Sequence, residues 1–146
     1  MNGAALWLTL YDARPGRAGV LPGSGVWFIY APRGGLTLGT GGEARIGTDD
    51  GRFAEPGSRL FGTSPAWLYE VAPAPEPFFE HADLLRSQIM ALRFGPRYLV
   101  RADRIESTPG AVTPRHGHRG PGMRRLIFGR LRAEVGEAVE RIDAGH

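Results

Sequence analysis

Short apolar segments recur along the first half of the chain, separated by glycine, proline and aspartate. Segments rich in aromatic and β-branched residues and bounded by such turn residues are typical of β-strands. The pattern therefore predicts strands over Leu6–Tyr11, Val26–Tyr30, Leu36–Leu38, Glu43–Ile46, Arg52–Ala54, Arg59–Phe61 and Ala66–Val71. Strands spaced this closely indicate a β-sandwich or a small barrel.

One segment has a different period. After the proline-rich stretch Ala72–Pro77, the apolar residues Phe78, Leu85, Ile89 and Leu92 recur at roughly helical spacing. The spacing predicts a short helix over Phe78–Phe94, ended by the Gly-Pro pair that follows it. His81 lies off the apolar positions, so we interpret it as a surface residue.

The strand pattern resumes after this predicted helix. We expect further strands over Tyr98–Val100, Asp103–Glu106, Arg124–Phe128, Leu131–Val135 and Ala138–Ile142. The whole pattern predicts an all-β chain in which two β-units are joined by a short helix.

A shift of 94 residues aligns the chain with itself without gaps. It places Pro15-Gly16 on Pro109-Gly110 and Gly42-Glu43-Ala44 on Gly136-Glu137-Ala138. Turn residues persist in diverged repeats because their backbone requirements are strict. We therefore predict a first β-unit over residues 1–72, a connector with the helix over 73–96 and a second β-unit over 97–146.

The second unit is shorter than the first in this alignment. The chain ends at His146, one residue after the equivalent of Gly51, whereas the first unit continues to Val71. About two strands are thus missing from the second unit, and an incomplete sheet exposes strand edges. Either the sequence is part of a longer chain, or another protomer or the first unit supplies those strands. We predict a homo-oligomer.

Composition narrows the classes of protein. The 146 residues include no cysteine, which excludes disulfides, thiolate metal sites and cysteine nucleophiles. No apolar run is long enough to span a bilayer, and the N-terminus lacks a basic leader, so we expect a cytoplasmic protein without a membrane partner. The net charge of +3 comes from arginine dispersed among acidic residues, which argues against a nucleic-acid partner.

The strongest chemical signal lies in the stretch from Gly110 to Gly129. It contains His116 and His118, and on a strand a spacing of two places both imidazoles on the same face. Neutral imidazole is a good ligand for divalent Zn, Ni, Mn or Fe. Two polar side chains that only bind water or neighbouring groups are the alternative interpretation.

This stretch resembles the first sequence motif of the cupin family, in which a glycine, His-x-His, a glutamate and a closing glycine follow one another at set spacing. Gly110, His116, His118 and Gly129 keep that register. Gly122 stands where the family has its metal-binding glutamate. The resemblance implies a jelly-roll double-stranded β-helix, in a two-cupin arrangement whose second barrel is incomplete.

The resemblance also implies a function. It points to a divalent transition metal on His116 and His118, in a metal-dependent dioxygenase or isomerase acting on a small molecule. The histidines are flanked by four arginines, Arg115, Arg119, Arg125 and Arg124. Because a guanidinium group binds a carboxylate through two hydrogen bonds, we expect an anionic ligand. Glu106 is a candidate substitute carboxylate ligand. The alternative is a non-catalytic cupin module for ligand binding or self-association; no catalytic residue is assigned.

Overall fold

The computed structural model describes residues 5–14, 19–23, 25–39, 42–73, 82–90, 97–118 and 120–145. Its elements are β-strands, with no helix among these residues. The chain divides into two compact units, Met1–Pro114 and Arg115–His146. The all-β prediction is therefore confirmed for the described part of the chain, whereas the predicted domain boundaries at residues 72 and 97 stay a prediction.

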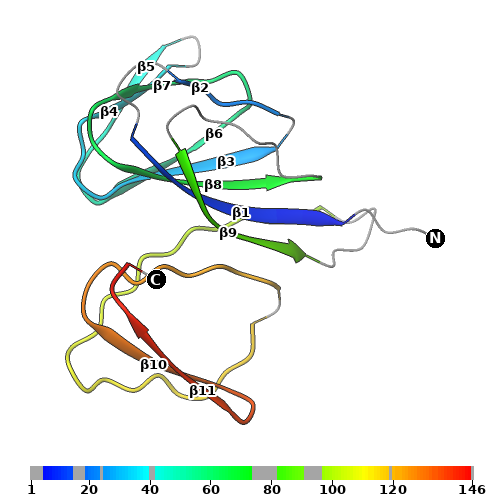
Figure 1. The fold of residues 1–146 in the computed structure, drawn as a ribbon, viewed down its shortest axis with the longest axis vertical. Helices are drawn as coiled ribbons and strands as arrows, with labels where there is room; N and C mark the ends of the chain where they lie inside the picture. The colour runs from blue at the N-terminus through cyan, green and yellow to red at the C-terminus, as the bar shows by residue number, and fades with distance from the viewer. Residues whose placement is uncertain are drawn as a thin grey trace. The chain divides into compact units, whose positions relative to one another are not determined.

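Among the residues that the structure describes, the first unit has nine strands in two sheets, whose arrangement is drawn in Figure 1. The five-stranded sheet has the order β6-β3-β8-β1-β9, and the four-stranded sheet has the order β2-β7-β4-β5. Their bounds are β1 Leu6–Ala13, β2 Gly19–Val20, β3 Val26–Ala31, β4 Leu36–Gly39, β5 Glu43–Ile46, β6 Asp50–Ala54, β7 Arg59–Gly62, β8 Ala66–Ala72 and β9 Ala82–Met90. All pairings are antiparallel.

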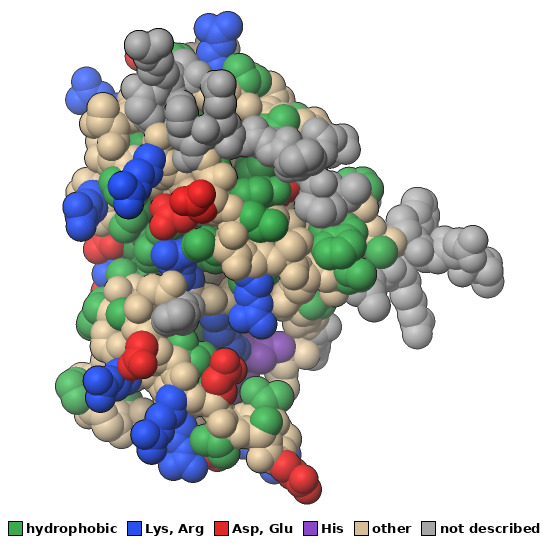
Figure 2. All heavy atoms as spheres, in the orientation of Figure 1, with side chains coloured by type: hydrophobic (Ala, Val, Ile, Leu, Met, Phe, Trp, Pro, Cys, Tyr) green, Lys and Arg blue, Asp and Glu red, His purple; other side chains and the backbone are tan. Residues whose placement is uncertain are grey.

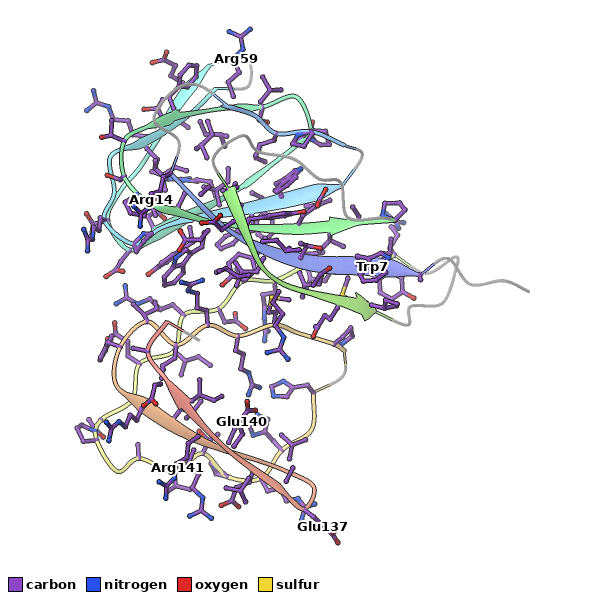
Figure 3. All side chains as sticks on the ribbon, viewed as in Figure 1. Trp7, Arg14, Arg59, Glu137, Glu140 and Arg141 are labelled. Carbon is purple, nitrogen blue, oxygen red and sulfur yellow. The ribbon has the colours of Figure 1, made fainter. Side chains whose placement is uncertain are left out.

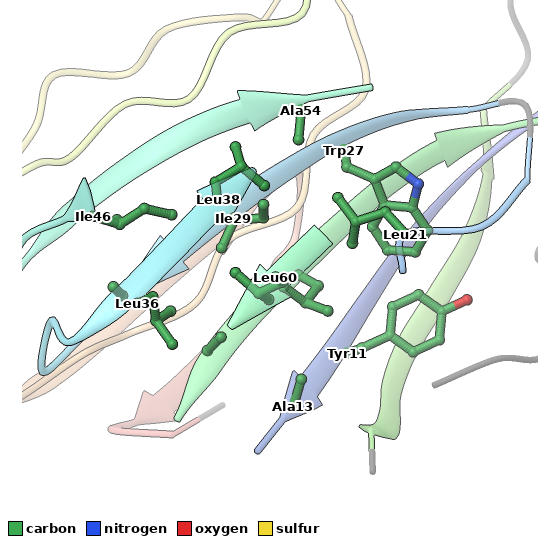
Figure 4. Close-up of a cluster of buried hydrophobic side chains, with 13 residues drawn as sticks. Tyr11, Ala13, Leu21, Trp27, Ile29, Leu36, Leu38, Ile46, Ala54 and Leu60 are labelled. Atoms are coloured by element: carbon green, nitrogen blue, oxygen red, sulfur yellow. The ribbon is translucent and has the colours of Figure 1, made fainter. Parts of the chain in front are cut away.

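The core lies between the two sheets, as in a β-sandwich. Alternate residues of β3 and β8, among them Trp27, Ile29 and Leu68, are fully buried on one side of the larger sheet. The smaller sheet contributes Leu36 and Leu60 to the same cluster (Figure 4). Burial of apolar side chains from both sheets is the main force that holds such layers together.

The predicted helix is wrong where the structure describes it. Residues 82–90 form β9, which pairs with β1 from Leu6↔Met90 to Ala13↔Ala82; residues 78–81 and 91–94 lie outside the described residues. The register skips between Arg86 and Leu84, so Leu85 is an extra residue in a β-bulge. The bulge interrupts the alternation of a strand, and the apolar residues then imitate helical spacing.

The described residues of the second unit form a β-hairpin. Its strands are β10 (Arg130–Val135) and β11 (Ala138–Asp143), joined by a tight turn at Gly136 and Glu137 (Figure 3). Gly136 has a φ of 62°, a conformation that glycine adopts without strain. The strands expected at 98–100, 103–106 and 124–128 are not formed, since these described residues belong to none of the sheets.

Within the described residues, no helix is long and apolar enough to cross a membrane.

Candidate functional site

The two histidines of the motif lie next to each other in the second unit. His116 and His118 lie in a segment that is not a β-strand. The strand geometry from which we predicted their proximity is therefore absent. Their rings nevertheless meet edge to face, with centroids 4.7 Å apart and an interplanar angle of 72°. Both side chains are exposed, and histidine is visible at the surface in Figure 2.

The Nε2 atoms of the two rings lie 3.2 Å apart, within hydrogen-bonding distance of each other. Imidazole nitrogens bind zinc at about 2.0–2.1 Å, so two nitrogens at this separation subtend an angle of about 100° at a shared ion. That angle lies between the values for octahedral and tetrahedral coordination. The geometry of the pair therefore fits two neighbouring ligands of one first-row metal ion.

One arginine contacts this pair directly. The guanidinium of Arg124 lies within hydrogen-bonding contact of His118 Nε2. Because guanidinium has only donors, His118 Nε2 must be the acceptor, and its ring proton then lies on Nδ1. The lone pair of His118 Nε2, which a metal would need, is thus directed at the guanidinium of Arg124.

The other predicted arginines have different surroundings. Arg115 is exposed, Arg125 is half-buried with an interior Nε atom, and Arg119 lies outside the described residues. Arg124, which the sequence places near the histidines with these three arginines, is therefore a described arginine in direct contact with an imidazole. The roles predicted for Arg115, Arg119 and Arg125 stay predictions.

The motif's carboxylate position is open. A Cβ atom on Gly122 meets no atom within 4 Å, and its φ is not in the left-handed range. Glu106 makes an ion pair with Arg104 in the first unit. Among the residues that the structure describes, no group of three or more His, Asp or Glu side chains is placed to hold a metal ion. Within this part of the chain the candidate site has two imidazoles.

A second polar cluster lies in the first unit and was not predicted. The hydroxyl of Tyr30 donates to Asp49 Oδ1 at 2.6 Å, and Arg104 contacts Asp49 Oδ2 at 3.1 Å. Tyr30 also stacks on Trp67, with ring centroids 5.2 Å apart. Burial of the ring, together with the hydrogen bond to Asp49, raises the pKa of Tyr30 to about 12. The phenol therefore remains protonated at neutral pH, and the cluster ties the segment containing Arg104 to β3.

Sequence reasoning also missed a buried carboxylate. Glu70 is fully buried in β8 and accepts a hydrogen bond of 3.2 Å from the hydroxyl of Tyr11. The burial of Glu70 could have been predicted from the sequence, because Ala66, Leu68 and Glu70 are alternate residues of one strand and lie on the same side of it. Beside Glu70, Thr9 hydrogen-bonds to Ser87 at 2.9 Å, which gives the sandwich interior a polar side near β1 and β9.

Comparison of the chain with models of protein families, with curated proteins and with solved structures finds no significant match. The candidate sites thus rest on their own chemistry.

Proposed function

We propose that this protein binds a divalent transition metal through His116 and His118 and that the bound metal recruits a small anionic molecule. The observation that carries the proposal is the 3.2 Å separation of the two Nε2 atoms, which suits adjacent ligands of one ion. Zn, Ni, Mn and Fe all accept imidazole. The resemblance of Gly110–Gly129 to the cupin motif supports the same assignment.

Two protein ligands leave most coordination positions to other groups. When bound, a metal of this kind acts as a Lewis acid that polarises an oxygen of its ligand. The chain's own contribution is to hold the two imidazoles at the right separation and to offer guanidinium groups for an anion. This arrangement is compatible with a dioxygenase or an isomerase.

Zinc titration followed by calorimetry tests the proposal directly. We expect one zinc ion per chain for the unmodified protein and loss of measurable binding for His116→Ala and for His118→Ala. His81→Ala is the matched control, since it removes an imidazole outside the His-x-His motif and is expected to bind like the unmodified chain. Zinc binding that survives the loss of both motif histidines would refute the proposal.

A non-catalytic role is the second candidate, and the exposure of both histidines favours it. An exposed half-site with two ligands can be completed by the same two histidines of a second copy, which gives four imidazoles around one ion. Sedimentation velocity separates the two functions. A zinc-dependent dimer that EDTA dissociates indicates self-association, whereas a monomer with one zinc per chain indicates a site open to small ligands.

A further inference from the structure

The guanidinium of Arg124 contacts the ring nitrogen through which His118 would bind a metal. This guanidinium and the Nε2 of His116 both face the same nitrogen, His118 Nε2, which has one lone pair. A metal ion on that nitrogen and the hydrogen bond from Arg124 exclude each other, since both need that lone pair. This conflict does not depend on which divalent metal binds.

We propose that Arg124 is a built-in competitor for the metal site, so that metal binding displaces its guanidinium and thereby frees it for an anionic ligand. The inference rests on the function proposed above and adds a coupling between the two ligands. Without metal, Arg124 is engaged with His118. With metal bound, Arg124 is a cation within reach of an anion on the metal, and guanidinium suits carboxylates and phosphates.

The coupling has a defined sign. Removal of Arg124 deletes both the hydrogen bond that the metal must break and a positive charge close to the ion. Charge-assisted hydrogen bonds are strong, but this one is exposed and is weakened by solvent. We therefore expect Arg124→Ala to bind zinc about five- to tenfold more tightly than the unmodified chain.

The experiment has two arms. The first measures zinc affinity by calorimetry for the unmodified protein, Arg124→Ala and Arg141→Ala. Arg141 is an exposed arginine of β11 in the same unit, so its removal controls for the general loss of one positive charge. The second arm records the ring ¹⁵N resonances of His118 without metal.

The second arm does not depend on metal binding. We expect His118 to be fixed as the Nδ1-protonated tautomer in the unmodified chain and to become a tautomer mixture in Arg124→Ala. Equal tautomer signatures in both proteins would overturn the proposal.

The zinc arm separates the two proposals. Zinc affinity of Arg124→Ala that is equal to or weaker than that of the unmodified chain overturns the competition and leaves the metal site in place. Absence of zinc binding in every variant overturns both. An equal gain in Arg141→Ala would show that net charge, and not the contact with His118, sets the affinity.

Discussion

At the scale of single residues, Gly122 decides how far the resemblance to the cupin motif extends. A side chain at this position meets open space and needs no left-handed backbone. Gly122→Glu therefore restores the missing carboxylate of the motif without steric cost. If the register holds, the third ligand should tighten zinc binding about tenfold or more, measured by the same calorimetry.

Gly120→Glu is the matched control for this substitution. A Cβ atom on Gly120 likewise meets no atom within 4 Å, and the residue lies two positions away, so the variant adds the same charge out of register. Equal tightening by both variants would show that the new carboxylate acts only through its charge, and the motif alignment would then lose its support.

Tyr30 gives a second residue-scale prediction, which concerns pH. Its pKa is raised to about 12 by burial and by the hydrogen bond to Asp49, against an ordinary value of 10.0. The unfolded chain therefore loses the phenol proton first as pH rises. The stabilisation from Tyr30 is complete below pH 10 and falls as pH approaches 12.

Tyr30→Phe isolates this effect, because it keeps the stacking on Trp67 and removes only the hydroxyl. We expect it to lower the free energy of unfolding at pH 8 by about 1.5–3 kcal/mol, the value of a hydrogen bond to a charged group. Urea unfolding at pH 8 and pH 11 checks the result: the gap between the two proteins should narrow at pH 11. A gap independent of pH would contradict the raised pKa.

At the scale of elements, β9 marks where sequence reasoning failed and why. Strand β8 pairs with one edge of β1. Along the other edge, eight residues of β1 pair with β9. That long-range pairing supplies interstrand backbone hydrogen bonds along β9, and it outweighs the local helical spacing of Leu85 and Ile89. Both remain exposed in the structure. The spacing of apolar residues within one segment carries no information about a strand edge that is distant in the sequence. The β-bulge at Leu85 also interrupts the alternation of side chains that would identify a strand.

The pairing of β9 with β1 is testable by a disulfide, since the chain has no cysteine of its own. Thr9 and Ser87 are cross-strand partners whose hydroxyls lie 2.9 Å apart, which places the two Cβ atoms on the same face. Partners in antiparallel strands meet the Cα spacing of a disulfide. We expect Thr9→Cys/Ser87→Cys to oxidise readily to an intramolecular disulfide, detected by a mobility shift under non-reducing electrophoresis.

Thr9→Cys/Gln88→Cys is the control for this pair. Adjacent residues of a strand point to opposite faces, so this disulfide should form far more slowly. A helix over residues 82–90 would present these positions without the strand alternation. Equal oxidation of the two double variants would therefore contradict β9.

At the scale of the whole molecule, the 94-residue repeat is matched only in part. The shift places β4 on the first four residues of β10 and most of β5 on β11, so a hairpin occurs at the same position in both copies. The registers differ, since Leu36 pairs with Ile46 whereas Arg130 pairs with Asp143. The equivalent of β3, residues 120–125, forms no strand. Turn glycines revealed the hairpins, but they carry no information on the sheets around them.

The two units also differ in how much they bury. All buried apolar side chains of the described chain belong to residues 10–90, and no described residue of 115–145 is buried. The regular structure in the described part of the second unit is a two-stranded hairpin, and such hairpins are marginally stable on their own in water. We therefore expect the free energy of unfolding of this protein to reside almost entirely in the first unit.

Truncation tests this division. A chain ending at Pro114 keeps both sheets of the sandwich, all three tryptophans and the contacts of Asp49 with Tyr30 and Arg104. We expect it to unfold cooperatively in urea and to retain the near-ultraviolet circular dichroism of buried Trp27. The peptide 115–146 should give the spectrum of an unfolded chain. A truncated chain that loses its tryptophan signal would show instead that the histidine-bearing unit stabilises the sandwich, and the metal site would then be coupled to folding.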